Sequence, residues 1–308
     1  MKTMNQQLLK TLRTSLPALC ALTLLAACGG GGGNPGVPPP IVSAATTSTV
    51  RYGDSLLITL VGSGLDQALT LSSASCKNFV RSTTAPNISS ATTAYYNCTV
   101  SGATGARSIS VSGGGVTAAT VAITVPVPEV TMIVSNGAGV AGTLVITLAP
   151  DRAPGTVDNF LAYVRSGFYN GTAFHRNGRS ATGGDFVLQG GGYNAPISAT
   201  ALFPAPKPVN APIALESGLS NLRYTVAMAR TSMLNSATSE FFINTANNAF
   251  LDTSGGGYAA FGTVTTGVSL VDAMSAAPCS VSTLNFGAGS IDCVPQPNLV
   301  IASAQQTR

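Results

Sequence analysis

The sequence predicts a mainly β protein made of two domains. Residues 41–126 contain short apolar and β-branched runs separated by Gly, Ser, Asn and Asp, which is typical of antiparallel strands. Residues 127–308 combine further strand patterns with two helical patterns that lie far apart in the sequence. The prolines of Pro126-Val127-Pro128 mark the boundary. Many strands with two separated helices indicate either an α+β domain or a closed barrel capped by helices.

The first domain, residues 41–126, contains no motif that carries chemistry. Its short, regularly spaced apolar runs favour a small antiparallel sandwich. The segments YGDSLLITLVGSGL and YYNCTV resemble the immunoglobulin-like modules of bacterial surface proteins, which is a likeness of fold alone. We expect this domain to act as a spacer or as a contact surface for another protein. Examples of these predicted strands are residues 55–61, 68–71, 95–100, 107–111 and 119–125.

Strand patterns stand at both ends of the second domain. Residues 129–134 and 143–148 alternate as two strands of a hairpin. They are joined by Asn136-Gly137-Ala138-Gly139, residues that tolerate turns with positive φ. Residues 299–302 would supply the closing strand of the domain.

Two helices are predicted in the second domain. Residues 151–167 form the first, because Pro154 suits a first helical turn and Gly167 suits a C-terminal stop. Residues 267–277 form the second. Helical spacing of apolar residues supports both helices. The side chains expected to face inward are Val157, Phe160, Leu161 and Val164 in the first helix and Val268, Val271 and Met274 in the second.

Residues 1–27 are predicted to be a signal peptide. Basic residues precede an uncharged apolar run over residues 16–27, which suits a signal peptide and is too short to span a bilayer as a helix. The run ends in Leu25-Ala26-Ala27-Cys28, which resembles a bacterial lipobox cut before Cys28. We expect a lipid on Cys28, a Gly/Pro-rich tether over residues 28–40, and anchoring in the bacterial envelope, at the outer membrane or periplasmic face. A plain secretory signal is the alternative.

Removal of the signal leaves a nearly neutral chain. Three of the 15 basic residues leave with residues 1–27 and all 11 acidic ones stay, so the net charge falls from +4 to +1. This balance argues against nucleic-acid binding. No later run is long and apolar enough for a transmembrane helix. We expect a monomer that needs no metal ion and no cofactor.

The cysteines indicate an oxidising compartment. Apart from the lipidation site, the mature chain has four cysteines, two in each domain: Cys76, Cys98, Cys279 and Cys293. We predict the disulfides Cys76–Cys98 and Cys279–Cys293, because other pairings would link the two domains. Each could stabilise the fold by about 3 kcal/mol in the chain-entropy model. A metal site is the weaker interpretation, because no CxxC motif is present and the single His is distant in sequence.

Two blocks in the second domain carry the chemistry. Residues 167–192 include GFYNGTAFHR and GGDFVLQGGG, and residues 239–252 are SEFFINTANNAFLD. Both blocks closely resemble the core motifs of the cyclophilin family of peptidyl-prolyl cis/trans isomerases. The resemblance covers residues 129–302 and implies an eight-stranded antiparallel barrel capped by two helices.

Prolyl isomerisation needs a small set of groups. Rotation about the bond before proline breaks amide resonance against a barrier of about 18–20 kcal/mol. Midway, the prolyl nitrogen regains a lone pair, and a donor aimed at it stabilises the twisted state more than either planar state. A dry apolar pocket grips the ring and strengthens the donor.

The resemblance assigns these roles to residues of this chain. Arg176 would be the catalytic donor, since its guanidinium stays charged and planar. Gln189 would hold the substrate backbone, and Phe242 would form the pocket floor. Proline-containing segments of folding envelope proteins would be the partners. The other implied substrate-binding residues are Phe186, Val187, Met228, Ala229, Phe250, Leu251 and Tyr258.

Other interpretations of the same residues are weaker. His175 is the only histidine, but no G-x-S-x-G elbow accompanies it, so we expect a supporting role. Gly190-Gly191-Gly192 precedes no Lys-Ser/Thr, which argues against a phosphate loop. Phe241 is expected in the barrel core rather than in the pocket.

Three departures from the family pattern bear on activity. The interval from Arg176 to Phe186 is longer than usual, so an insertion near residues 177–184 must loop out without moving Arg176. Glu240 replaces the usual Gln, and its carboxylate could pair with Arg176 or Arg230. Val187 replaces a longer Met, which would widen the pocket.

Three functions therefore stay open on sequence grounds. The leading hypothesis is a lipid-anchored isomerase that acts on folding envelope proteins. The second is a module or envelope chaperone that binds proline-containing segments without turnover, which the inserted loop would favour. The third is a structural or adhesive surface protein in which the sandwich domain matters most.

Overall fold

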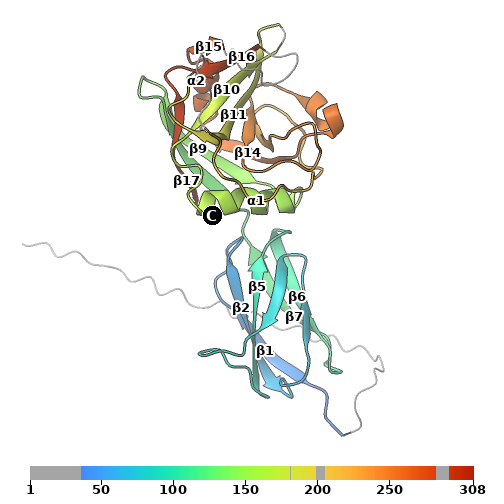
Figure 1. The fold of residues 1–308 in the computed structure, drawn as a ribbon. Helices are drawn as coiled ribbons and strands as arrows, with labels where there is room; N and C mark the ends of the chain where they lie inside the picture. The colour runs from blue at the N-terminus through green and yellow to red at the C-terminus, as the bar shows by residue number, and fades with distance from the viewer. Residues whose placement is uncertain (1–35, 181, 199–204, 282–290) are drawn as a thin grey trace, which may run out of the picture.

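The computed structural model describes residues 36–180, 182–198, 205–281 and 291–308. The predicted signal peptide, Cys28 and the first part of the tether lie outside these residues. Two β-rich bodies are joined end to end, and helix α1 (Pro154–Arg165) lies on the side of the second body that faces the first (Figure 1). Within the described ranges, no helix is long and apolar enough to cross a bilayer.

The first body consists of two antiparallel sheets, which is compatible with the predicted sandwich. One sheet has the strand order β1-β2-β5-β4 and the other β3-β6-β7. Buried and partly exposed residues alternate along β5, as expected when one face of a sheet covers a core. The predicted disulfide is confirmed between Cys76 and Cys98. The strands are β1 Ile41–Thr47, β2 Ser55–Ser63, β3 Thr70–Ser72, β4 Cys76–Arg81, β5 Thr93–Val100, β6 Gly105–Ser112 and β7 Ala119–Val125.

The second body is a closed antiparallel barrel of eight strands, which confirms the predicted fold. The order is β11-β13-β12-β14-β9-β8-β17-β10, and β10 pairs with β11 to close the ring. A further hairpin, β15–β16, is attached to β10. The strands are β8 Glu129–Ser135, β9 Ala141–Leu148, β10 Thr172–Arg179, β11 Asp185–Asn194, β12 Thr225–Met228, β13 Phe241–Asn244, β14 Ala260–Thr266, β15 Cys279–Val281, β16 Ile291–Pro295 and β17 Leu299–Gln306.

The two predicted helices are present. Pro154 opens α1, and Gly167 follows it with a φ of 68°, a left-handed conformation that favours glycine. The Phe160 ring lies 4.8 Å from that of Phe261 between ring centroids, so α1 packs onto the barrel core. The second helix, α2, covers Val268–Ser275. Val268 was expected to face inward, and this is wrong: it is the first residue of the helix and is exposed.

Helix α1 also contacts the sandwich through charged groups. Asp158 accepts hydrogen bonds from Lys77 Nζ and Ser101 Oγ, each at 2.6 Å. Arg165 donates to the carbonyl oxygen of Gly53 at 2.6 Å and lies 3.0 Å from the Asp54 carboxylate. One helix therefore serves both the barrel core and the junction between the two bodies.

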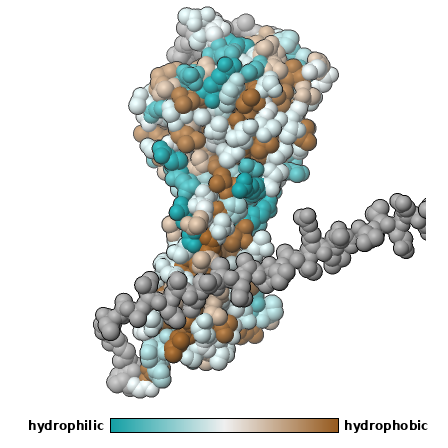
Figure 2. All heavy atoms as spheres, turned by 180° about the vertical axis from the view of Figure 1, so that it is seen from behind, coloured by the Kyte–Doolittle hydropathy of each residue, from teal (hydrophilic) through white to brown (hydrophobic). Residues whose placement is uncertain are grey.

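Tyr52 lies at the centre of this junction. Its side chain is fully buried, and its hydroxyl accepts a hydrogen bond from the backbone N–H of Gly102 at 3.0 Å. Its carbonyl oxygen accepts from Gln306 Nε2 at 3.1 Å, which ties it to the last barrel strand. Burial raises the pKa of Tyr52, and the charge of Asp158 raises it further, so the phenol is neutral at physiological pH. On the face seen in Figure 2, hydrophilic and hydrophobic residues are interspersed over the barrel.

Replacing Arg165 by Ala should weaken the junction. The substitution removes its bonds to Gly53 and to Gln306 Oε1, so the free energy of unfolding should fall by about 1–2 kcal/mol in urea titrations followed by circular dichroism. Arg223→Ala is the matched control, because its ion pair with Asp272 is exposed on both sides and should contribute less than about 0.5 kcal/mol. Equal losses for the two variants would contradict the assigned role of the junction.

Candidate active site

The key polar and apolar site residues lie in one row across five neighbouring strands. Arg176 of β10 pairs with Gln189 of β11, and Gln189 pairs with Phe242 of β13. Phe242 pairs with Ala227 of β12, which pairs with Ala260 of β14. Directly opposed residues of antiparallel strands project to the same face of a sheet. The row therefore places Arg176 and Gln189 beside the Phe242 ring on the outer face of the barrel.

A bulge in β10 turns Arg176 to this face. Phe174 pairs with Gly190, and the next pair along the ladder is Arg176 with Gln189, so His175 is an extra residue on β10. Without the bulge, Phe174 and Arg176 would share a face. With it, Phe174 packs fully buried in the barrel core while Arg176 projects outward, half-buried. Gly190 makes this possible, because a Cβ there would lie 3.1 Å from the Phe174 ring.

A small apolar cluster on the outer face is separate from the barrel core, and we call it the cup. The Phe242 ring lies at its floor, in the middle of the cross-strand row. Phe186 and Val187 come from β11, and Leu251 comes from the short helix η1 (Ala249–Asp252). The buried members are Val187, Ala227, Phe242, Leu251 and Ala260, and the half-buried members are Phe186, Leu219, Ala229 and Tyr258.

Aromatic contacts hold the walls of the cup. The Tyr258 ring stands edge-on to Phe242, with centroids 5.8 Å apart and an interplanar angle of 74°. The Arg230 guanidinium lies 4.3 Å from the Tyr258 ring centroid and donates to the carbonyl oxygen of Gly257, which fixes that wall. On the opposite side, Phe250 stacks on Phe186 with centroids 6.0 Å apart. Phe250 is 58% exposed, so it forms a rim that a ligand can contact.

Met228 does not belong to the cup, although the sequence motif suggested it. Its neighbours Ala227 and Ala229 line the cup, and successive residues of a strand point to opposite faces. Met228 therefore faces inward, where it is buried in the barrel core opposite Phe241. Conversely, Leu219, Ala227 and Ala260 line the cup but belong to no motif that the sequence analysis used. Their placement depends on strand pairing and could not be found from local sequence.

The Arg176 guanidinium reaches the edge of the cup. A Cβ built on Gly178 would lie 3.5 Å from the guanidinium carbon of Arg176, 3.4 Å from the Phe186 ring and 3.1 Å from a methyl of Val187. These three side chains therefore lie close together around Gly178, where a larger residue would be crowded. Arg176 Nη1 also donates to Gln189 Oε1 at 3.0 Å. The site thus combines a fixed cation, an amide and an apolar bowl.

Glu240 lies directly behind this pair. Its carboxylate accepts a hydrogen bond from Gln189 Nε2 at 2.8 Å and lies 3.3 Å from His175 Nε2. Burial alone would raise the pKa of Glu240, but its interactions with His175 and Gln189 and the charge of Arg176 outweigh burial and lower the pKa below the ordinary value. Arg230, considered above as a partner for Glu240, instead holds the Tyr258 wall.

His175 and the triple glycine support the site. His175 is 1% exposed, and its ring stands edge-on to Tyr193 with centroids 4.9 Å apart. A Cβ on Gly191 would lie 2.9 Å from the Ser239 carbonyl oxygen, and one on Gly192 would lie 2.5 Å from Glu240 Oε1. Two of the three glycines thus allow close approach of the segment before β13, and Phe241 packs in the core as expected.

The insertion after Arg176 extends the β10–β11 hairpin. The ladder continues from Arg176 through Asn177–Leu188 and Gly178–Val187 to Arg179–Asp185, so the extra residues lie at the tip. Pairing continues beyond Arg176, and the strand that carries it is not interrupted.

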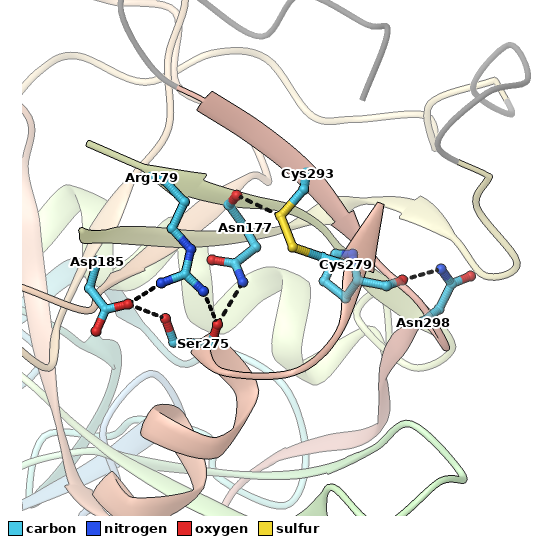
Figure 3. Close-up of a disulfide and its surroundings, with 8 residues drawn as sticks. Asn177, Arg179, Asp185, Ser275, Cys279, Cys293 and Asn298 are labelled. Atoms are coloured by element: carbon cyan, nitrogen blue, oxygen red, sulfur yellow. Dashed lines mark hydrogen bonds and ion pairs between the residues drawn. A yellow bond between two sulfur atoms is a disulfide. The ribbon is translucent and has the colours of Figure 1, made fainter. Parts of the chain in front are cut away.

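The attached hairpin braces this extension from its other edge (Figure 3). Strand β16 pairs with β10 through Asn177 and Cys293, and the predicted disulfide Cys279–Cys293 is confirmed between β15 and β16. Asn177 Nδ2 donates to the carbonyl oxygen of Ser275 at 2.8 Å, and Arg179 donates to the same oxygen and pairs with Asp185. The residue that follows Arg176 is therefore held by α2 and by a disulfide-linked hairpin.

None of the site contacts described above joins a nucleophilic side chain to a base. In the part of the chain that the structure describes, no group of three or more His, Cys, Asp or Glu side chains could hold a metal ion. What the arrangement can do is bind a compact apolar group in the cup while presenting Arg176 and Gln189 to polar atoms beside it.

Comparison with known proteins agrees with this geometry. Residues 130–306 match the family described as cyclophilin type peptidyl-prolyl cis-trans isomerase/CLD. The chain is 48% identical over 141 residues to peptidyl-prolyl cis-trans isomerase cyp18 of Streptomyces antibioticus, covering 44% of this chain and 78% of that protein. It is 43% identical over 167 residues to peptidyl-prolyl cis-trans isomerase A of Dickeya dadantii, covering 54% and 80%.

A third relative is peptidyl-prolyl cis-trans isomerase B of Escherichia coli, which is 39% identical over 171 residues, covering 53% of this chain and 92% of that protein. The family match spans more than half of the chain and overlaps every strand of the barrel. With the closed barrel and the cup, these likenesses show that the chain belongs to the cyclophilin-type peptidyl-prolyl cis–trans isomerases.

Proposed function

We propose that Arg176 drives isomerisation by donating a hydrogen bond to the prolyl nitrogen of the twisted substrate. The planar imide offers little electron density at that nitrogen, whereas the half-rotated bond restores its lone pair. A cation beside the cup therefore interacts more strongly with the transition state than with either planar state, which is the condition for catalysis.

The cup and Gln189 would provide the positioning. A proline ring is compact and apolar, and the Phe242 floor with the Phe186 and Tyr258 walls offers it a surface largely screened from water. Gln189 lies between the Arg176 and Phe242 positions of the cross-strand row, where its amide can bond to the substrate backbone. Excluding water strengthens the Arg176 hydrogen bond, because the local dielectric is low.

One observation carries this proposal. Arg176, Phe186 and Val187 all lie within 3.5 Å of the point where a Gly178 side chain would be. A ring seated in the cup would therefore lie close to the guanidinium. No other described arginine lies in the Arg176–Gln189–Phe242 row.

Arg176→Ala should lower kcat/KM for a proline-containing peptide by about 100- to 1,000-fold, the range for loss of one transition-state hydrogen-bond donor. Arg176→Lys should give an intermediate loss, because it keeps the charge but not the planar donor fork. Peptide exchange followed by NMR measures the rate without a coupled protease. Arg223→Ala serves as the control and should match wild type.

An Arg176→Ala protein that isomerises as fast as wild type would overturn the assigned role of Arg176. If wild type bound the peptide but gave only the uncatalysed rate, the chain would instead be a binding module.

We also propose that the enzyme acts on exported proteins while anchored by a lipid on Cys28. Support comes from the apolar leader that ends in Leu25-Ala26-Ala27-Cys28 and from the Gly/Pro-rich residues 28–40. Two disulfides, Cys76–Cys98 and Cys279–Cys293, suit an oxidising compartment. Unfolded envelope proteins would supply the proline-containing segments.

Cys28→Ser should release the protein from membranes. When the chain is expressed in a bacterium, wild type should partition into detergent and show an acylated N-terminal peptide by mass spectrometry, whereas the variant should stay in the aqueous phase. Cys279→Ser is the control and should still partition into detergent. An unmodified wild-type N-terminus would contradict lipidation without affecting the proposed role of Arg176.

A further inference from the structure

Glu240 is connected to Arg176 through the side chain of Gln189. Gln189 Nε2 donates to Glu240 Oε2 at 2.8 Å, and Gln189 Oε1 accepts from Arg176 Nη1 at 3.0 Å. His175 Nε2 lies 3.3 Å from the same carboxylate oxygen. The amide that is proposed to hold the substrate thus stands between a carboxylate and a guanidinium.

The chemistry of these two groups fixes the orientation of the amide. An ionised carboxylate can only accept hydrogen bonds, and a guanidinium can only donate them. Gln189 must therefore turn its nitrogen toward Glu240 and its oxygen toward Arg176. A neutral amide at position 240 could donate or accept, so the orientation of Gln189 would then be set by Arg176 alone and no longer from both sides. Protonation of Glu240 would relax the constraint in the same way.

The surroundings are built to hold a carboxylate at this place. A Cβ on Gly192 would lie 2.5 Å from Glu240 Oε1, so glycine leaves the room that the carboxylate occupies. The side chain is 28% exposed. Burial raises the pKa of both Tyr169 and Tyr193, and the charge of Glu240 raises both further. The ionisable groups that face it are His175 and Arg176 on β10, Tyr193 on β11, and Tyr169 before β10.

We propose that Glu240 is a positioning residue whose ionised carboxylate fixes the Gln189 amide, and through it the Arg176 guanidinium, so that isomerisation by this chain slows in acid. The inference rests on the proposed role of Arg176. Its sign follows from the lowered pKa of Glu240: the carboxylate is ionised above its ordinary pKa, and the constraint disappears as the pH falls through the lowered value.

The decisive experiment compares wild type with Glu240→Gln, which keeps the size of the side chain and removes its charge. At pH 7 the variant should lose roughly threefold to tenfold in kcat/KM, mostly in kcat, because one charge-assisted contact of the catalytic pair is replaced by a neutral one. As the pH is lowered from 7, wild-type kcat/KM should fall when the pH passes through the lowered pKa of Glu240, while the variant should stay nearly flat.

Two further measurements make the outcome specific. Glu129→Gln removes a carboxylate far from the cup, on β8, and should keep the wild-type profile. The side-chain amide resonances of Gln189 should titrate in wild type with the same acid midpoint as kcat/KM and should not titrate in Glu240→Gln. Circular dichroism at each pH identifies the range over which both proteins stay folded.

A Glu240→Gln protein with wild-type kcat/KM at pH 7 would overturn the inference. Side-chain amide resonances of Gln189 that do not change with pH in wild type would overturn it as well. Either result leaves the Arg176 proposal standing if Arg176→Ala still shows its expected loss of kcat/KM. If Arg176→Ala retains full activity, the proposed mechanism fails first, and the Gln189 resonances alone then report whether Glu240 orders the amide.

Discussion

The register between β10 and β11 is the constraint on which the whole site depends. One extra residue, His175, shifts the ladder so that Phe174 points into the barrel while Arg176 points out of it. The same register pairs Arg176 with Gln189, and Gln189 pairs in turn with Phe242 at the floor of the cup. Because side chains alternate along a strand, a slip of one residue would bury Arg176 and expose Phe174. The bulge is therefore as much a part of the active site as the groups that touch substrate.

Several features reinforce that register from outside the ring of strands. The β15–β16 hairpin, closed by Cys279–Cys293, adds a second partner to the end of β10, and Asn177 and Arg179 bond to the last turn of α2. The insertion after Arg176 thus lengthens a braced ladder instead of loosening it. The sandwich is joined to the opposite side of the fold through α1, where Asp158 and Arg165 bond to it. These contacts join the sandwich to the helix that packs on the barrel core.

Local sequence patterns predicted the parts of the fold that local forces decide. The spacing of Val157 and Phe160 identified the buried face of α1, and the motif around Arg176 located the cup. Pairings between distant segments were harder to predict from local sequence. Met228 was misplaced because its face depends on the alternation of β12 against β13, which no single segment reveals. Strand β4 has a weak apolar signal, because three of its six residues are exposed. Leu219 reaches the cup from a loop without any motif, so only the folded chain shows it.

The most direct test of the central claim is a structure of the chain bound to a short proline-containing peptide. The account predicts a proline ring in the cup against Phe242, with a guanidinium nitrogen of Arg176 within about 3.5 Å of the prolyl nitrogen or its adjoining carbonyl oxygen. A ring bound elsewhere, or an Arg176 side chain turned away from a ring seated in the cup, would contradict it.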